Sequence, residues 1–301
     1  MKKNLKISIV IVNYNSFHLL ENCLNSIAKS SLTKNDYEVI VVDNASYGKE
    51  AILIKKKYAW VKVFANSSNE GFSKANNRGI RRAKGSYILL LNPDTIVSKE
   101  SLACALDTLQ SHPDAGIVTC KVKLLSGEID DASHRGFPTA WNAFCHFVGL
   151  GRCFPKSLLF NGYHLGYQNM DILHEVDSCC GAFMLVRKKA GDEVGWLDED
   201  YFWYGEDIDL CYTLKEKGWK ILYQPSCEII HLKGASSGIK THSRFLSKAD
   251  VSIQKQATEA RFDVMKIFYK KHYRTKYPEV VTYCIFAVIS IKKYFALLQY
   301  R

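Results

Sequence analysis

The chain has 301 residues and a formal net charge of +11; 47% of its residues are hydrophobic and 24% are charged. These proportions are ordinary for a globular protein with a sizeable core, so they exclude a disordered chain. The positive charge suits nucleic acid, an anionic membrane surface or a small phosphorylated substrate, and we expect no nucleic acid because the sequence holds no basic-aromatic recognition module.

Up to residue 111, short apolar runs alternate with helical patterns. Four of the runs predict buried strands, at residues 7–12, 38–42, 61–64 and 87–91. Apolar residues recur at helical spacing in four further segments, at residues 17–29, 49–58, 71–83 and 98–111. This alternation predicts an α/β fold with a mainly parallel, Rossmann-like sheet and helices on both of its faces.

The remaining sequence is less regular. Residues 127–167 are rich in aromatic residues and glycine, and we expect loops and short elements there. The pattern beyond them predicts two strands, at residues 180–187 and 220–223, and two helices, at residues 208–217 and 257–273. The segment 237–249 is polar, and we expect it to be mobile.

The tail carries an apolar run at 280–291, followed by Lys292 and Lys293. A spanning helix needs about 20 apolar residues, so this run is too short before the lysines. Two interpretations stay open, a helix packed on the core and an in-plane membrane helix with basic and aromatic flanks. We therefore expect a domain at 1–255 and a C-terminal helical extension at 256–301, which contacts a membrane in the second interpretation.

The ten cysteines bear on the location of the protein. Most are single residues within apolar runs, where reduced thiols behave as small apolar groups. No Cys-x-x-Cys pair is present, which argues against a zinc site. Because the N-terminal apolar run is also too short for a signal peptide, we expect a cytoplasmic protein, either free or peripheral on the inner face of the cell membrane.

Polar residues follow each of the first four predicted strands. These strand ends are Asn13-Tyr14-Asn15, Asp43-Asn44-Ala45-Ser46, Asn66 with Asn69-Glu70-Gly71, and Asn92-Pro93-Asp94. In parallel sheets, ligands bind beyond the carboxyl ends of the strands. One such ending is explained by turn or cap chemistry, but four in succession predict a shared polar cleft.

Two aspartates at these ends are candidate ligand-binding residues. Asp43 can accept hydrogen bonds from a ribose or from the imide NH of a pyrimidine, although a helix cap is the favoured explanation when Asp43 is taken alone. Asp94 can ligate a divalent cation that bridges two phosphates. The alternative for Asp94 is an Asn-Pro-Asp turn.

Residues 198–209 form the densest acidic-aromatic run of the chain. A sugar transferase needs a general base near the acceptor hydroxyl, and a partly desolvated carboxylate can serve. Glu206 and Asp207 are candidates, and Trp203 offers an apolar platform; the alternative is an acidic helix start. His231 is a further candidate ligand, although a lone histidine is more often structural. The sequence contains no GxGxxG, P-loop, HExxH or GxSxG motif.

Taken in order, these segments resemble glycosyltransferase family 2, which has the GT-A fold. The resemblance runs from about residue 7 to residue 237. It is carried by the strand ends above, by the run from Asn69 to Gly79, and by Gly181-Ala182-Phe183-Met184, Gly205-Glu206-Asp207-Ile208-Asp209-Leu210-Cys211 and His231. The motifs Asn-Glu-Gly-Phe and Tyr-Gly-Glu-Asp-Ile-Asp-Leu-Cys are similar to those of bacterial rhamnosyltransferase-like members that build surface polysaccharides.

The resemblance implies a role for each candidate residue. Those implied to bind the nucleotide-sugar donor are Val12, Tyr14, Asp43, Asn69, Asn76 and Asn92. Those implied to bind the acceptor are Gly181, Ala182, Trp203 and Glu206, with Asp207 as the catalytic base. Asp94 and His231 are implied to hold a divalent cation, Mg²⁺ or Mn²⁺. One departure is that the metal motif has a single acidic residue where many members have two.

The implied function is an inverting transfer of a sugar, rhamnose in the members it resembles, from a nucleoside-diphosphate-sugar to a hydroxyl of a glycan or lipid-linked glycan. The process served is cell-surface polysaccharide synthesis. The alternative is a catalytically inactive nucleotide-sugar-binding or scaffold protein. The presence of Glu206, Asp207 and His231 disfavours that alternative, because an inactive binder needs no acceptor side.

Overall fold

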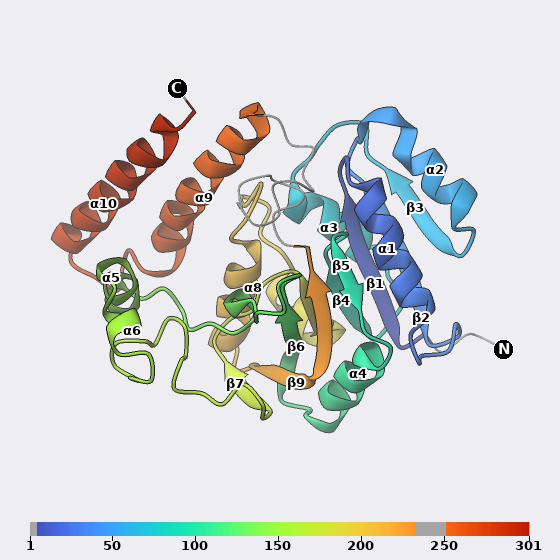
Figure 1. The fold of residues 1–301 in the computed structure, drawn as a ribbon, viewed down its shortest axis with the longest axis horizontal. Helices are drawn as coiled ribbons and strands as arrows, with labels where there is room; N and C mark the ends of the chain where they lie inside the picture. The colour runs from blue at the N-terminus through green and yellow to red at the C-terminus, as the bar shows by residue number, and fades with distance from the viewer. Residues whose placement is uncertain (1–4, 233–250, 301) are drawn as a thin grey trace.

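The computed structural model describes residues 5–232 and 251–300, so the segment predicted to be mobile at 237–249 lies outside the described residues. Within this part, nine strands form one curled sheet in the order β3-β2-β1-β4-β8-β6-β9-β5, and β7 pairs with β9 (Figure 1). The strands are β1 (Ile7–Asn13), β2 (Tyr37–Asp43), β3 (Val61–Ala65), β4 (Tyr87–Leu91), β5 (Thr95–Val97), β6 (Ala115–Lys123), β7 (His174–Val176), β8 (Phe183–Arg187) and β9 (Lys220–His231).

Helices follow most of the strands. They are α1 (Phe17–Ala28), α2 (Glu50–Lys57), α3 (Phe72–Ile80), α4 (Ser101–Ser111), α5 (Ala140–Val148), α6 (Leu150–Cys153), α7 (Lys188–Val194), α8 (Glu206–Glu216), α9 (Val251–His272) and α10 (Glu279–Leu298). Two short 3₁₀ helices are η1 (Tyr47–Lys49) and η2 (Asp131–Ser133). The loops and short elements predicted over 127–167 are confirmed by η2, α5 and α6.

The sheet is mostly parallel, as predicted. The strands β3, β2, β1 and β4 form a continuous parallel block, and β6 pairs in parallel with β9. Antiparallel pairing enters through β8, which lies between β4 and β6, and through β5 and β7 on β9. Since β1 to β4 run in one direction, their polar carboxyl ends lie at one edge.

The core occupies both faces of this sheet because side chains alternate along each strand. In β1, Ile9 and Ile11 pack in a cluster with residues of α1 and α4. Val10 points to the opposite face, into a cluster with Ile80 of α3 and Leu210 of α8. The prediction of helices on both faces is thereby confirmed.

The helices α9 and α10 form an antiparallel pair beside this core (Figure 1). Phe268 of α9 and Tyr273, the residue after this helix, pack against Tyr212 of α8, whereas Ile289 is the one buried residue described in α10. The predicted boundary at 255/256 falls inside α9, and the division into a domain and an extension stays a prediction.

The helix α10 is longer than the apolar run from which it was predicted. It continues through Lys292 and Lys293 to Leu298, and it is the one helix in the described ranges that is long and apolar enough to cross a membrane, by length and composition. Length and composition alone give weak evidence of a span, since core helices of soluble proteins also meet them.

Candidate active site

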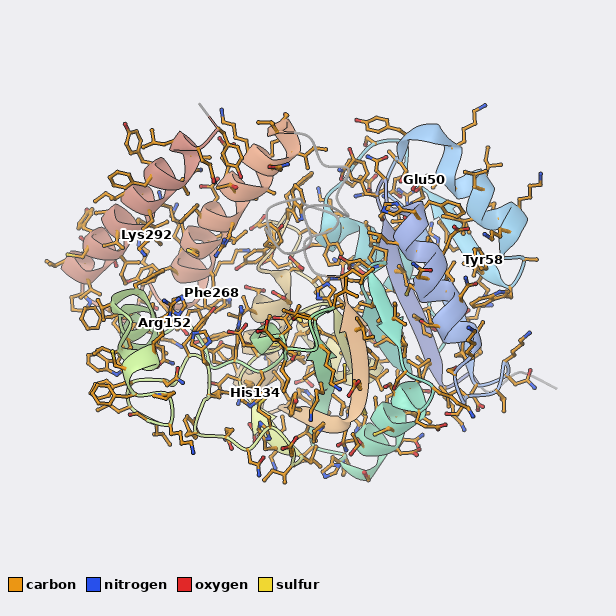
Figure 2. The ribbon with its side chains drawn as sticks, viewed as in Figure 1. Glu50, Tyr58, His134, Arg152, Phe268 and Lys292 are labelled. Atoms are coloured by element: carbon orange, nitrogen blue, oxygen red, sulfur yellow. The ribbon has the colours of Figure 1, made fainter. Side chains whose placement is uncertain are left out.

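A cavity of about 2150 Å³ lies beyond the carboxyl ends of β1 and β4 and extends to the helices α5, α9 and α10. Glu50 lines it near the parallel strands. Arg152 of α6, Phe268 of α9 and Lys292 of α10 line its other end (Figure 2). The shared polar cleft predicted from the strand ends therefore corresponds to one part of a longer cavity.

The structure brings four of the predicted donor-binding residues to this cavity, namely Val12, Tyr14, Asn69 and Asn92. Asp43 and Asn76 are not among its lining residues. Asp43 is buried, and it accepts hydrogen bonds from Asn13 Nδ2 at 2.8 Å and from the Ser46 amide at 3.3 Å. Asn76 is buried too and donates to the Phe72 carbonyl within its own helix at 3.0 Å. Direct donor contacts by these two residues stay a prediction.

Asn44, which the sequence analysis did not single out, holds the donor side together. Its Nδ2 donates to Asn69 Oδ1 at 2.7 Å and to the Gly71 carbonyl at 3.2 Å, and its Oδ1 accepts from Asn66 Nδ2 at 2.8 Å. The strand end of β2 is thereby fixed to the loop that precedes α3. The clustering of Asn residues at these strand ends was the signal for this network.

Gly71 joins that loop to the acidic-aromatic segment. Its φ is +84°, and a Cβ here would lie 2.7 Å from the ring and 2.9 Å from the carbonyl oxygen of Phe202. The amide of Phe72 also donates to that carbonyl at 2.8 Å. Only glycine satisfies both the backbone conformation and the close approach.

Asp94 and His231 lie side by side in the cavity wall, as the resemblance implied. His231 Nε2 is 3.3 Å from Asp94 Oδ1, and its Nδ1 is 3.7 Å from Asp130 Oδ2. Burial lowers the pKa of His231, but the two carboxylates outweigh burial and raise this pKa to about 9. Near neutral pH, the imidazole is therefore a cation paired with Asp94.

Asp94 and His231 supply part of the ligand set that a hard cation needs. Asp94 offers carboxylate oxygen and His231 offers nitrogen once its proton is displaced. Among the described residues, no group of three or more His, Cys, Asp and Glu is placed to hold an ion. A divalent cation bound here would take most of its ligands from a diphosphate and water, as Mg²⁺ commonly does.

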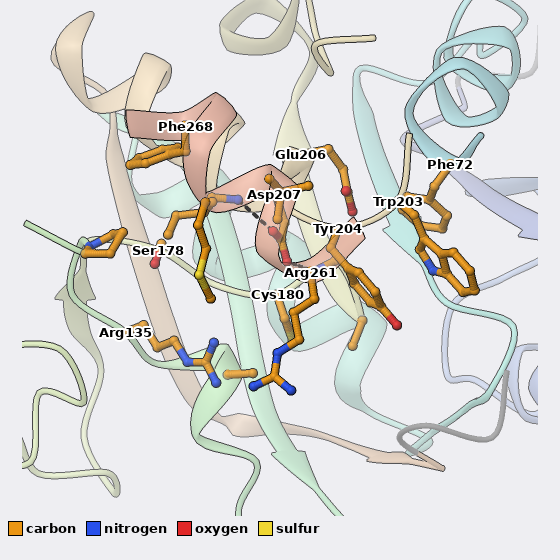
Figure 3. Close-up of a pocket in the computed structure, with 18 of the residues that line it drawn as sticks. Phe72, Arg135, Ser178, Cys180, Trp203, Tyr204, Glu206, Asp207, Arg261 and Phe268 are labelled. Atoms are coloured by element: carbon orange, nitrogen blue, oxygen red, sulfur yellow. Dashed lines mark hydrogen bonds between the residues drawn. The ribbon is translucent and has the colours of Figure 1, made fainter. Parts of the chain in front are cut away.

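Glu206 and Asp207 open α8 and line the cavity (Figure 3). Asp207 Oδ2 accepts from the Gly181 amide at 3.2 Å, and its Oδ1 accepts from the Ile208 amide at 2.8 Å. Burial raises the pKa of both carboxyl groups, and the charge of Asp207 raises that of Glu206 further. The amide hydrogen bonds favour the ionised form of Asp207. Of the two carboxyl groups, Asp207 is therefore the one that mainly carries the negative charge.

The remaining predicted acceptor residues surround this pair. Gly181, Ala182 and Trp203 line the cavity, and the Trp203 ring stacks on that of Tyr204 with centroids 5.5 Å apart and planes at 12°. A Cβ on Gly181 would meet protein atoms only at 3.9 Å. Protein packing therefore does not require glycine at 181, and the space beside it is open to a ligand.

Solved structures with a similar fold are glycosyltransferases. The structure of GalNAc-T7 with UDP, GalNAc and Mn²⁺ matches 77% of this chain with a TM-score of 0.58 at 20% identity, and the chain spans 44% of that protein. Residues 1–349 of Staphylococcus aureus TarS match 90% of this chain with a TM-score of 0.53 at 18% identity, covering 73% of that structure. This likeness shows that the chain has the GT-A fold.

The model of glycosyl transferase family 2 matches residues 8–194, and the chain belongs to that family. It is a nucleotide-sugar-dependent glycosyltransferase. An N-acetylglucosaminyl-diphospho-decaprenol L-rhamnosyltransferase of Mycobacterium tuberculosis is 28% identical, with 76% of this chain and 77% of that protein covered. Rhamnosyltransferase WbbL of Escherichia coli K12 is 29% identical, with 74% of this chain and 82% of that protein covered.

Proposed function

We propose that the enzyme is an inverting transferase, rhamnosyl-type by its relatives, that moves a sugar onto a hydroxyl of a glycan or lipid-linked glycan for cell-surface polysaccharide. The observation that carries this proposal is the placement of Asp207. Two backbone amides orient its carboxylate, which lies in the wall of the cavity that the strand-end residues of the donor side and Trp203 also line. The relatives named as rhamnosyltransferases support the sugar class.

The reaction is one in-line displacement. The acceptor hydroxyl oxygen forms a bond to the anomeric carbon while Asp207 takes its proton, and the bond from that carbon to the diphosphate breaks on the opposite face. The nucleoside diphosphate leaves and the anomeric configuration inverts. A Mg²⁺ or Mn²⁺ ion would be held by Asp94 and His231 and would supply charge stabilisation to the diphosphate.

The test replaces Asp207 by Asn. This change keeps the volume and removes the proton acceptor, so transfer falls by about 10²–10⁴-fold, while the affinity for the nucleoside diphosphate stays within about twofold. Turnover is measured with a panel of nucleotide sugars, and nucleotide affinity by calorimetry. Asp107→Asn is the matched control, because Asp107 is exposed on α4 and does not line the cavity. Turnover in the Asp207 variant equal to wild type would overturn the proposed base.

We further propose that the protein acts as a peripheral protein on the cytoplasmic face of the cell membrane. The residues Val280, Tyr283, Ile291 and Phe295 of α10 are exposed, as are Phe144 and Val148 of α5. The Lys292 ammonium lies 4.0 Å from the centre of the Phe147 ring, which ties the two helices together. An apolar surface with basic residues suits an anionic bilayer.

A further inference from the structure

Two arginines that the mechanism does not use direct their guanidinium groups into the cavity near Cys180 and Asp207 (Figure 3). Arg135 follows η2, and Arg261 belongs to α9. Arg135 Nη2 is 3.3 Å from Asp131 Oδ1, and its Nη1 is 3.5 Å from the Tyr163 hydroxyl. Its Nε is buried without a hydrogen-bond partner in the described part of the chain.

Among the described residues, Asp131 is the one carboxylate in hydrogen-bond contact with these guanidinium groups, and Asp130 and Asp207 act on Arg135 at longer range. The Asp131 carboxylate is shared between Arg135 and His164, because its second oxygen is 2.8 Å from His164 Nδ1. Arg261 forms no ion pair within residues 5–232 and 251–300. Guanidinium groups bind phosphates through paired hydrogen bonds, so two of them facing one cavity with a single shared carboxylate make an anion site.

The anion site lies between the catalytic carboxylate and the helical end of the cavity. On one side, the Arg135 charge reaches Asp207 and opposes the rise in pKa that burial causes there. On the other side, Arg135 Nη1 is 3.5 Å from the Tyr163 hydroxyl, and the Tyr163 ring centroid lies 5.1 Å from that of His146 in α5, against which α10 packs. The order along the cavity is therefore Asp207, the arginines, and then α5 with α10.

Beyond the arginines, the cavity wall becomes apolar. Side chains from three helices line it there, and they include Phe144, Met265, Phe268, Val281, Ile285 and Val288. This wall is distinct from the donor end, where Asp94, His231 and the asparagines lie. A hydrocarbon chain is the ligand that such a wall favours, because burial of apolar surface is favourable.

We infer that the cavity binds its acceptor as a lipid diphosphate-linked sugar, with the diphosphate held between Arg135 and Arg261 and the hydrocarbon chain along α5, α9 and α10. The inference rests on the proposed function, since it places the acceptor hydroxyl at Asp207. A ligand with a hydroxyl, a diphosphate and a hydrocarbon in that order matches the order of carboxylate, cations and apolar wall. A neutral glycan would leave the guanidinium groups without an anion.

The first experiment measures binding of farnesyl diphosphate, farnesol and inorganic pyrophosphate to the full chain. A saturating nucleoside diphosphate with Mg²⁺ blocks the donor end, and tryptophan fluorescence reports binding. We expect farnesyl diphosphate to bind at least tenfold more tightly than either farnesol or pyrophosphate. Equal affinities of farnesyl diphosphate and farnesol would overturn the inference.

Variants of the two arginines make the test specific. Arg135→Gln and Arg261→Gln should each weaken farnesyl diphosphate binding at least tenfold and leave farnesol binding unchanged. The exposed Arg274, which does not line the cavity, supplies the matched control Arg274→Gln, expected to bind as wild type. Because Arg261 is exposed, its variant keeps the test valid where Arg135→Gln fails to fold. An unchanged diphosphate affinity in Arg261→Gln contradicts the proposed site.

The apolar wall is tested by chain length. Farnesyl diphosphate should bind several-fold more tightly than geranyl diphosphate, and Val288→Asn should remove that difference. Ile291→Asn is the control, since Ile291 lies on the same helix but does not line the cavity. No gain with chain length would refute the apolar subsite. These binding results do not depend on turnover, so a failure of the Asp207→Asn test contradicts the proposed function separately.

Discussion

At the scale of single residues, Glu206 and Asp207 are neighbours in sequence but differ in environment. Asp207 accepts two backbone hydrogen bonds, whereas Glu206 Oε2 is buried with no hydrogen-bond partner in the described part of the chain. Burial and the charge of Asp207 raise the pKa of Glu206. Two adjacent carboxyl groups with separated proton affinities are typical of acid–base sites, and this difference selects Asp207 as the base.

This difference predicts a pH-dependent effect of Glu206→Gln on stability. A carboxyl group whose pKa is raised by folding contributes no cost below its unfolded pKa of about 4.3, and stability falls as pH rises from that value to the folded pKa. The variant removes this loss, so its free energy of unfolding should exceed that of wild type at pH 7 by about 1–3 kcal/mol. At pH 4 the two should be equal.

Urea denaturation at both pH values measures this difference. A variant that is less stable than wild type at pH 7, or whose stability gain is the same at pH 4, contradicts the assignment. Because a protonated Glu206 resembles Gln, we also expect Glu206→Gln to retain transfer within about tenfold of wild type. That outcome would distinguish Glu206 from Asp207, whose amide variant should lose about 10²–10⁴-fold.

At the scale of secondary-structure elements, α8 and α9 are joined through one buried carboxylate. The Tyr201 hydroxyl donates to Asp209 Oδ1 at 2.9 Å, and His272 Nε2 of α9 is 2.6 Å from the same oxygen. Lys271 adds ion pairs to Asp198 and, at 2.7 Å, to Asp200. These contacts hold the acidic-aromatic segment, and with it Trp203, against both helices.

Tyr201→Phe should therefore destabilise the protein. The change removes one donor from a buried carboxylate, and hydrogen bonds to charged groups contribute about 1.5–3 kcal/mol, so we expect a loss of about 2 kcal/mol. Tyr283→Phe is the matched control, because Tyr283 is exposed on α10. Chemical denaturation measures both variants. A loss of the same size in both, or none in Tyr201→Phe, contradicts the linking role of Asp209.

The sequence predicted the elements whose periodicity is uninterrupted and missed those in which it is broken. The parallel block and its helices follow from clean apolar runs, and its polar carboxyl ends meet because parallel strands share a direction. The strand β9 continues to His231, eight residues beyond the predicted end. A register shift between Cys120 and Lys121 of its partner accommodates Pro225 and its neighbours, and proline cannot donate to a ladder. The strands β5, β6 and β7 and the helix α7 were not predicted.

The residues of the candidate site, like the secondary-structure elements, were predicted in part from the sequence. Asp94, His231 and Asp207 were found because each follows or begins a regular element, and the structure brings all three to one cavity. Helical spacing does not reveal which face of α3 borders the cavity, so the sequence did not show that Asn76 is buried outside the cavity lining. Arg135 and Arg261 are far apart in sequence, and only the packing of α9 brings them together.

At the scale of the whole molecule, the net charge and the form of the cavity are consistent with the same proposed function. The chain carries a net charge of +11, and its cavity changes along its length from polar strand ends to apolar helices. The helices α5 and α10 lie at the helical end (Figure 1), and both carry exposed apolar side chains. This arrangement suits the proposed membrane contact, in which the helical end would rest on a bilayer while the other end takes a water-soluble donor.

This arrangement predicts binding of the full chain to anionic vesicles. Flotation with phosphatidylglycerol vesicles should recover the protein, neutral phosphatidylcholine vesicles should recover at least tenfold less, and raised salt should release it. Ile291→Asp and Phe295→Asp place charges on the exposed face of α10 and should each reduce recovery at least tenfold. Ile52→Asp, on the exposed surface of α2, is the control and should float as wild type.

The same experiment separates a peripheral helix from a spanning one. The helix α10 is long enough to span by length and composition, but Lys292 and Lys293 lie within it, and a lysine near the centre of a bilayer is costly. Lys293 also forms an ion pair with Asp263 of α9 at 2.8 Å, which a spanning α10 would have to break. An alkaline carbonate wash should therefore release the protein from the vesicles, and retention after that wash contradicts peripheral binding.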